Sequence, residues 1–477
     1  MGNERLRRIL WIIWSLATIG LVAWMANIML IDATDKGIFM PGALTPGHHQ
    51  LQLACEACHS DPLGGPEVLQ EACLNCHGDD RKKPFDSHPM SKFRDPRNAD
   101  RLEHLDALHC ATCHTEHRPE ITRKNGVTQP RDLCAHCHGD IAVDRPSHRG
   151  MAFTTCAASG CHNFHNNRSL YTKFLIKHLD EPALLEDPVV PQRVFAQVLD
   201  QIVEYPVEQY PVQALSPQDA DDDFTFMVGP REQSHADWAA TAHAQSGVNC
   251  SACHQPKAQD GTQPAWTDHP DEQVCASCHS LEADRFTRGK HGMRLAAGLP
   301  PLQVNEARLS MRADAGHESL GCNSCHVAHR YDVKRAAAEA CTACHDDTHT
   351  LAYEGSPHHK LWQMELSGEL PAGSGVSCAT CHMPRIEFDV SDWLTRVMVD
   401  HNQNANLSPN SKMIRTACLQ CHGLEFSIDA LADQNLIDNN FRGSPSLHID
   451  TMDLAAAEKE RRYNEAGEDD DTSMFGF

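Results

Sequence analysis

The sequence predicts a mainly α-helical protein with extensive loops, little or no β structure, and a core formed by bound prosthetic groups. Three observations support this fold class. All 22 cysteines occur in pairs whose second member is followed directly by histidine. Only 6% of the residues are aromatic, which leaves little material for an ordinary apolar core. Residues 9–31 contain no charged side chain, which predicts one N-terminal transmembrane helix.

The N-terminus begins with a short basic segment that precedes the apolar stretch. Residues 1–8 contain Arg5, Arg7 and Arg8. By the positive-inside rule, residues 1–8 are predicted to be a cytoplasmic tail, and 9–31 a single-pass anchor in the inner membrane. The rest of the chain is then predicted to lie on the periplasmic, extracytoplasmic side. A cleaved signal peptide is the alternative, although a clear small-x-small cleavage site is missing.

The cysteine pairs are numbered here as motifs 1 to 11 in chain order. Ten of them read C-x-x-C-H, the attachment signature of c-type haem. The cysteines of motifs 1 to 5 are Cys55 and Cys58, Cys73 and Cys76, Cys110 and Cys113, Cys134 and Cys137, and Cys156 and Cys161. Those of motifs 6 to 11 are Cys250 and Cys253, Cys275 and Cys278, Cys322 and Cys325, Cys341 and Cys344, Cys378 and Cys381, and Cys418 and Cys421.

The histidine that ends each motif is the predicted proximal ligand of the haem iron. These histidines are His59, His77, His114, His138, His162, His254, His279, His326, His345, His382 and His422. Zinc sites and disulfide frameworks also use paired cysteines, but neither requires a histidine after each pair. Motif 5 has four residues between its cysteines, so a disulfide is the alternative there. The sequence thus predicts eleven covalently attached haem c groups.

The motifs form two groups, and these define the predicted domains. Residues 32–178 are predicted to be a pentahaem domain and residues 235–430 a hexahaem domain. Between them, residues 179–234 are rich in proline and acidic residues and are predicted to be a linker, or an arm that packs on a neighbour. Residues 193–203 in this stretch have the spacing of a short amphipathic helix. Residues 431–477 are predicted to be a disordered acidic tail, with a docking peptide as the alternative.

The 21 histidines outside the motifs are numerous enough to supply a second imidazole to every iron. In the first group the candidates are His48 or His49, His88, His104, His117, His148, His165 and His178. In the second they are His235, His243, His269, His291, His317, His329, His349, His358 or His359, and His401. The narrower predicted set of distal ligands is His49, His88, His104, His117, His148, His165, His243, His269, His291, His317, His329, His358 and His401. Iron with two imidazoles passes electrons but has no open position for a substrate.

Two stretches of the chain resemble known families. Residues 48–178, with HLDALHCATCHTEHRP and SHRGMAFTTCAASGCHNFHNN, are similar to cytochrome c3/c7-like pentahaem proteins, one of which is a subunit of the quinol-oxidising alternative complex III. This resemblance implies an electron-transfer role with bis-histidine haems.

Residues 235–430, with GKHG, SPHH, GVSCATCHMP and DHN, resemble the pentahaem nitrite reductase and hydroxylamine oxidoreductase superfamily. That resemblance implies a distal-ligand role for His401, and also for His291 and His358. The superfamily's C-x-x-C-K motif is absent from the chain, and neither Tyr331 nor Tyr353 is marked as a residue that cross-links to haem.

These observations favour an electron-transfer protein, and no catalytic residue is predicted. The expected partners are the bilayer, a quinol-oxidising membrane complex as donor, and a cytochrome, a reductase or an outer-membrane conduit as acceptor. The formal charge of −24 gives no basic footprint, so nucleic acid is not an expected partner. Two alternatives are an enzyme that acts on a small nitrogen or sulfur compound at one five-coordinate haem, and a structural or assembly role.

Overall fold

The computed structural model is mainly helical, as the sequence predicts. It describes the chain except for residues 1, 31–35, 53, 62–63, 82–87, 89, 104, 157–160, 163, 166–170, 189, 192–212, 225–229, 257–263, 393, 408 and 474–477. Within the described residues there is a single sheet of two strands, so the prediction of little β structure is confirmed. The amphipathic helix predicted at residues 193–203 lies outside the described residues.

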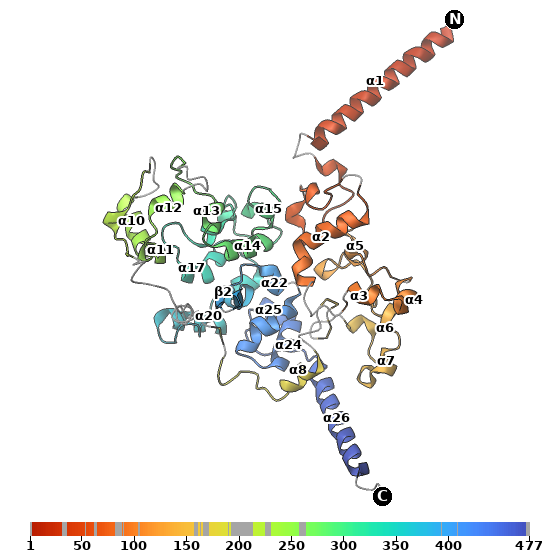
Figure 1. Cartoon of the computed structure of the whole chain (residues 1–477), viewed down its shortest axis with the longest axis vertical. Coiled ribbons are helices and arrows are strands. Elements are labelled where there is room, and N and C mark those ends of the chain that lie inside the picture. Colours follow the sequence, from red (N-terminus) through yellow and green to blue (C-terminus); the bar gives the residue numbers. More distant parts are fainter. Residues whose placement is uncertain are drawn as a thin grey trace. The chain divides into compact units, whose positions relative to one another are not determined.

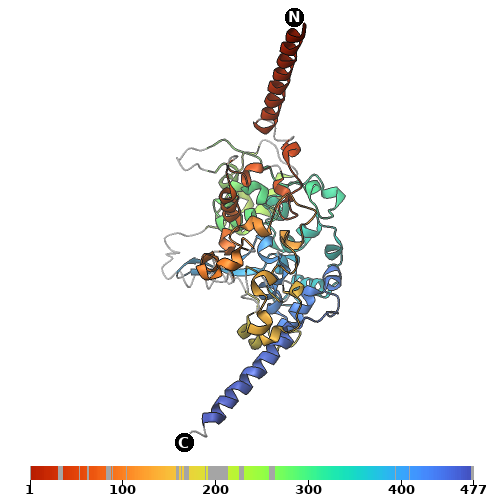
Figure 2. The same ribbon diagram turned by 90° about the vertical axis from the view of Figure 1, so that its right-hand side faces the viewer.

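Helix α1 (Gly2–Leu30) is uninterrupted (Figures 1 and 2). Within the part of the chain that the structure describes, its span Asn3–Ile28 is the one stretch long and apolar enough to cross a membrane. At about 1.5 Å per residue it exceeds the roughly 30 Å of a bilayer's hydrocarbon core. A helix with these properties at the N-terminus is either a membrane anchor or a signal sequence. The predicted sidedness stays a prediction.

The chain divides into two compact units. Unit 1 comprises Met1–Asp79 and Pro96–Pro130, and unit 2 comprises Asp80–Asp95 and Arg131–Phe477. Motifs 1 to 3 therefore fall in unit 1, and motifs 4 to 11 fall in unit 2. The boundaries predicted from the sequence at residues 178 and 235 do not coincide with this division and stay a prediction.

Unit 1 consists of short helical turns around one longer helix. Beyond α1 its elements are η1 (Lys36–Phe39), η2 (His49–Leu51), η3 (Cys55–Ala57), α2 (Pro66–Arg81, which runs into unit 2), η4 (Pro96–Asn98), α4 (Ala99–Leu102), α5 (Cys110–Cys113) and η5 (Lys124–Gly126). Helix α2 begins at Pro66, a residue favoured at the first position of a helix because its missing N–H would have no helical partner. It carries the whole of motif 2.

Unit 2 contains most of the helices and the sheet. Its first elements are α3 (Met90–Phe93), α6 (Ala135–His138), α7 (Ile141–Asp144), η6 (Pro146–His148), η7 (Phe153–Thr155), α8 (Thr172–Lys177), η9 (Pro217–Asp219), α10 (Arg231–Ala239), α11 (Ala242–Gln245), α12 (Cys250–His254), α13 (Glu272–Ala276), α14 (Ser280–Arg288) and α15 (Met293–Ala296).

The elements that follow are η10 (Val304–Glu306), η11 (Ala313–Ala315), α16 (Cys322–Cys325), α17 (Val333–Ala337), α18 (Glu339–Thr342), α19 (Thr348–Leu351), α20 (Pro357–Ser367), α21 (Cys378–His382), β1 (Arg385–Ser391), β2 (Leu394–Val399), α22 (Gln403–Leu407), η12 (Asn410–Lys412), α23 (Met413–Thr416), η13 (Cys418–Gln420), α24 (Leu424–Ala432), α25 (Gln434–Asp438) and α26 (Thr451–Ser473).

The main apolar core of unit 2 joins segments that are far apart in the sequence. It consists of Leu175, Met413, Ile414, Ala417, Leu424, Ile428, Leu431, Met452 and Ala455. These residues come from α8, α23, α24 and the first turns of α26. A smaller cluster contains Ala338, Tyr353 and Trp362. The packed region therefore extends beyond residue 430, into the segment that the sequence predicts to be a tail.

The sheet is an antiparallel hairpin between motif 10 and His401. Arg385 pairs with Val399 in its register, and Ile386 pairs with Met398. Two ion pairs tie this region to α14. Arg285 binds Asp400 through two hydrogen bonds, of 2.8 and 2.5 Å, and Arg396 pairs with Glu282. The hairpin thus fixes where the chain re-enters the core at His401.

Candidate haem-binding sites

Each motif folds into about one helical turn, and a backbone hydrogen bond closes it. In motif 3 the His114 N–H donates to the Cys110 carbonyl over 2.9 Å, and in motif 8 the His326 N–H donates to the Cys322 carbonyl over 3.0 Å. This turn places the two thiols and the imidazole on adjacent positions of one short helix. Such an arrangement presents three attachment points to one prosthetic group.

The stretched motif 5 keeps this closing bond. The His162 N–H donates to the carbonyl of Cys156, the first cysteine of the pair, over 3.0 Å. Like the other cysteines of the chain, Cys156 and Cys161 are not joined by a disulfide in the structure. The extra residues therefore do not change the relation between the first cysteine and the histidine.

Nine of the motif histidines stand opposite a second histidine ring within the described residues. The ring centroids are 5.9 to 6.3 Å apart in every case. With the motif histidine second, the pairs are His48 and His77, His88 and His138, His148 and His162, His329 and His254, His243 and His279, His401 and His326, His291 and His345, His349 and His382, and His358 and His422.

This spacing fits one iron between two imidazoles. Metal–nitrogen bonds of about 2 Å on opposite sides of a metal put the two ring centres about 6 Å apart. Aromatic rings in direct contact have centroids about 4.5 to 7 Å apart, so the argument for iron is the narrow distance range that all nine pairs share. The residues present therefore fit haem iron, and each pair joins one motif histidine to one histidine from elsewhere in the chain.

Hydrogen bonds at Nδ1 orient many of these rings. His254 donates to the Thr267 carbonyl over 2.7 Å, and His422 donates to the Ala183 carbonyl over 2.8 Å. On the opposite side of the pairs, His88 donates to Phe164, His349 to Ile437, and His401 to Val399, over 2.7, 2.5 and 3.0 Å. A ring that donates through Nδ1 keeps Nε2 as the atom that binds a metal, and such bonds fix the ring orientation.

Burial favours the neutral form of three imidazoles of unit 2. Desolvation, with a smaller contribution from the opposite ring, lowers the pKa of His291 and of His358 to about 4. The pKa of His382 is lowered to about 4 for the same reasons. Neutral imidazole is the form that binds a metal. These three rings therefore have the protonation state that iron ligation requires.

One site contains a small, partly open cavity lined by motif 6 and by His329. Aromatic side chains form much of its wall. The His254 ring stacks on Trp266 at 5.1 Å, and Phe224 meets His254 edge to face at 4.6 Å. Tyr331 also lines the cavity and packs on His243, the ring opposite motif 7. The cavity is thus apolar, with the metal-binding groups at two of its walls.

Neighbouring motifs bring their first cysteines together. Hydrogen bonds join the thiols of Cys73 and Cys110, of Cys275 and Cys322, and of Cys341 and Cys378. A weaker bond of this kind joins Cys134 and Cys156. These bonds connect motifs 2 and 3, 4 and 5, 7 and 8, and 9 and 10. Groups attached to such cysteines are neighbours.

The remaining candidates are placed differently. His49 begins η2 next to His48, so the ring opposite His77 is His48 and not the predicted His49. His117 donates through Nδ1 to the Gly42 carbonyl over 2.8 Å, and His165 meets Phe164 edge to face. His269 is exposed, and His317 is 80% exposed and pairs with Glu318. His104 lies outside the described residues.

Three further candidates are described as well. His178 binds Glu181 at 2.5 Å, and His235 binds the buried Asp222. His349, which the narrower set omits, stands opposite His382. It lies four residues after His345, in α19, where the sequence gives no sign of which iron it faces. Two motif histidines lie outside the nine pairs. His114 donates through Nδ1 to the Gly126 carbonyl over 3.3 Å, and His59 has no second imidazole against it within the described residues.

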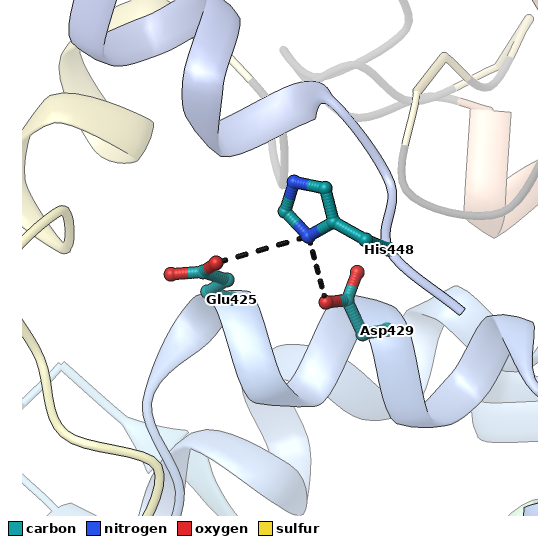
Figure 3. A group of neighbouring side chains, drawn as sticks. All are labelled: Glu425, Asp429 and His448. Carbon is teal, nitrogen blue, oxygen red and sulfur yellow. Dashed lines mark hydrogen bonds and ion pairs between the residues drawn. The ribbon is translucent and has the colours of Figure 1, made fainter. Parts of the chain in front are cut away.

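A separate cluster joins the two ends of the C-terminal region (Figure 3). His448 lies between α24 and α26. Its Nδ1 is 3.1 Å from Asp429 and 3.8 Å from Glu425, and its Nε2 is 2.7 Å from Asp453. Hydrogen bonds to Asp453 and Asp429 raise the pKa of His448 to about 9. The arrangement is an ion-pair clamp that holds the first turn of α26 beside α24.

Comparison with known proteins identifies one segment. A family model described as cytochrome c3 matches residues 47–139, which contain motifs 1 to 4. No curated protein and no solved structure matches the chain. The chain therefore contains a cytochrome c3-like, multihaem segment that carries covalently bound haem c and transfers electrons. The match does not reach residues 235–430, whose resemblance to the nitrite reductase superfamily stays a prediction.

Proposed function

We propose that the chain is a membrane-anchored cytochrome c with eleven haems. It passes electrons between a quinol-oxidising membrane complex and periplasmic or extracellular acceptors. The observation that carries this proposal is the set of nine histidine pairs, because each supplies both axial ligands of one iron. Haem iron supplies one-electron oxidation and reduction. The chain itself provides the thioether attachments, the two imidazoles, and the exclusion of water.

The number of haems is supported by motif 5. Its closing hydrogen bond from His162 to Cys156 repeats the geometry of the C-x-x-C-H motifs, and His148 stands opposite His162 with ring centroids 6.0 Å apart. A disulfide would need neither feature. We therefore count the stretched pair as an attachment site, which brings the number of sites to eleven.

Contacts within unit 2 support continuous transfer between the two groups of motifs. Residues that follow motif 5 pack directly on motif 11. The Leu185 N–H donates to the Cys421 carbonyl over 2.8 Å, and the Arg415 guanidinium lies 3.7 Å from the centre of the Phe174 ring. Near motif 5, the Cys161 thiol lies 3.8 Å from the Thr451 hydroxyl at the start of α26. Motifs 5 and 11 thus border the same apolar core.

The membrane anchor and the partners are supported by sequence features. Within helix α1, three arginines precede an uncharged stretch that begins at Ile9, which favours an anchor with the haem-binding region outside the cytoplasm. The formal charge of −24 favours an acceptor with a positively charged docking face. The donor is proposed by resemblance to the pentahaem subunit of alternative complex III.

One observation favours the alternative function, an enzyme with an open haem. His59 of motif 1 has no second imidazole against it within the described residues. An iron held there by His59 alone would have an exchangeable position at which a small nitrogen or sulfur compound could react. The two functions therefore differ in what they require at motif 1.

The test is low-temperature electron paramagnetic resonance (EPR) of the oxidised full-length protein, with haem content measured on the same sample. We expect about eleven haems per chain, as the motif count requires, and only low-spin signals. Nitrite, hydroxylamine and sulfite should leave the spectrum unchanged. A stoichiometric high-spin signal, or a shift on adding one of these compounds, would establish an open haem and refute a pure conduit.

A further inference from the structure

The ligand spacing of motifs 1 to 3 repeats in motifs 6 to 8. His48 lies seven residues before the first cysteine of motif 1, and His243 lies seven residues before the first cysteine of motif 6. At the other end, His117 lies three residues after the histidine of motif 3, and His329 lies three residues after the histidine of motif 8. The intervals between the motifs differ, as expected for loops of different length.

The structure repeats the pairing as well as the spacing. His48 stands opposite the second motif of its set, His77, at 5.9 Å, and His243 stands opposite the second motif of its set, His279, also at 5.9 Å. The thiols of the second and third motifs are hydrogen-bonded in both sets. Two independent relations between corresponding residues are therefore the same.

The third relation is visible in one set. His329, which trails the third motif, stands opposite His254 of the first motif at 6.0 Å. By the repeat, His117 is the residue that corresponds to His329, and His59 corresponds to His254. Motif 1 is one of the two motifs, with motif 3, whose histidines are not among the nine described pairs.

His117 has the backbone conformation of His329. Its φ is 61° and that of His329 is 66°, both in the left-handed region that residues other than glycine rarely adopt. Strain of this kind persists where a functional position requires it. The Nδ1 atom of His117 donates to the Gly42 carbonyl over 2.8 Å, which keeps Nε2 as the metal-binding atom.

The neighbourhood of His117 reaches motif 1. The carboxylate of Glu116, the residue before His117, interacts electrostatically with the Cys58 thiol. In the other set, Tyr331, two residues after His329, lines the same cavity as Cys253. The trailing segment of each set therefore lies near the second cysteine of its first motif.

We propose that residues 48–117 and 243–329 are two copies of one three-haem module, and that His117 is the distal ligand of the haem attached at Cys55 and Cys58. This inference rests on the proposed function, because it assumes haem at both sets of motifs. With His117 as its second ligand, the iron at motif 1 has no exchangeable position, so this site no longer favours an enzyme. The copies share the same ligand topology although their loops differ in length.

The experiment uses the full-length, haem-loaded protein and the single variants H117A, H329A and H448A. H117A is expected to convert one haem per chain from low spin to high spin by EPR, and to bind carbon monoxide at one reduced haem. H329A should do the same at motif 6. H448A, which removes the histidine of the ion-pair clamp between α24 and α26, should keep the wild-type spectrum. H117M should restore a low-spin haem at a raised potential, because methionine can serve as an axial ligand.

The outcomes separate the inference from the function it rests on. If H329A opens one haem and H117A opens none, the assignment of His117 is overturned while the bis-histidine conduit stands. A high-spin haem in the wild-type protein that H117A leaves unchanged also overturns it. If H329A opens no haem either, the histidine pairs are not ligand pairs, and the proposed function fails with the inference.

Discussion

Residues 48–117 and 243–329 hold the same set of histidines and cysteines in different surroundings. In the first region, His48 donates to the Glu116 carboxylate over 2.6 Å, and Thr45 donates to the same carboxylate through its N–H and its hydroxyl. In the second, the corresponding His243 packs edge to face on Tyr331 at 4.8 Å. The same arrangement of histidines therefore lies beside a carboxylate in the first region and beside an aromatic ring in the second.

This difference predicts different reduction potentials for the two regions. A carboxylate that accepts a hydrogen bond from an axial imidazole makes it a stronger donor, which stabilises the oxidised iron. An apolar, aromatic wall offers no such stabilisation to a charged centre. We therefore expect the haem at His48 and His77 to have a lower potential than the haem at His243 and His279.

The two regions also differ in how much of the fold depends on bound haem. Among the described residues of 47–130, the buried apolar side chains are Ala54 and Ala72. Unit 2 has in addition the apolar core around Ile414, Leu424 and Ile428. The second region is thus attached to a core of its own, and the first relies on its prosthetic groups.

The largest expected effect is on this apolar core. Ile428 is 1% exposed. Its replacement by alanine is expected to lower the free energy of unfolding by about 2–5 kcal/mol, because the cavity left behind cannot collapse. Denaturant titration followed by far-UV circular dichroism measures the loss. The matched control is Leu74→Ala in α2, where the side chain is 39% exposed and a change of about 0.5 kcal/mol is expected. Equal losses would remove the contrast between the regions.

The second effect concerns the ion pair that holds the segment of His401. Arg285→Gln leaves the buried Asp400 carboxylate without its cation, which is expected to cost about 2 kcal/mol. Because Asp400 precedes His401, a fraction of one haem should also become high-spin. Arg288→Gln on the same helix breaks only the exposed pair with Asp284 and is expected to cost less than about 0.5 kcal/mol. A wild-type EPR spectrum for Arg285→Gln would show that His401 does not depend on this pair.

The third effect sharpens the comparison of potentials. Burial alone would raise the pKa of Glu116, but hydrogen bonds from His48 and Thr45 outweigh it and lower the pKa to about 2, so the group is charged at neutral pH. Glu116→Gln is expected to raise the potential of one haem by up to about 60 mV, equivalent to a tenfold change for one electron. Spectroscopic redox titration measures it. The control is Glu120→Gln, which removes an exposed carboxylate paired with Arg118 and should leave all potentials unchanged.

The smallest effect concerns the ion-pair clamp of His448, which lies near the C-terminal end of unit 2. The pKa of His448 is raised to about 9, so its contribution to stability is complete below about pH 6.5 and is lost as the pH rises through 9. Hydrogen exchange at the first turn of α26, corrected for intrinsic rates, should therefore speed up over this interval. His448→Gln should exchange at the faster rate throughout. The same pH profile in this variant would exclude His448 as its cause.

The sequence is enough to predict the mainly helical fold and a multihaem cytochrome segment, because C-x-x-C-H is a local pattern within one helical turn. The number of haems stays a prediction. The distal ligands are harder to predict, because they are brought in by tertiary packing. His401 lies 75 residues after its partner His326, and His88 lies 50 residues before His138. One feature of the sequence favours His48 over His49 as a ligand. Only His48 lies seven residues before the first cysteine of its motif, as His243 does.

Two other features show where the sequence is a weaker guide. Met452 and Ala455 are buried against α24, although the surrounding helix is polar enough to read as an exposed tail. The hairpin at residues 385–399 is partly indicated by the sequence, because branched and polar residues alternate there, as is typical of a β-strand. Its cause is tertiary, because the ion pairs from Arg285 and Glu282 on α14 hold it in place.

Among the described residues of 47–130, the near absence of large buried apolar side chains bears on when this region can fold. A chain that cannot bury enough apolar surface stays unfolded until its ligand is bound, as small metal-dependent domains do. We therefore expect residues 47–130 to reach the haem-attachment machinery as an unfolded, protease-sensitive polypeptide. When haem is scarce, limited proteolysis should remove these residues first, so that haem supply controls how much of the protein matures.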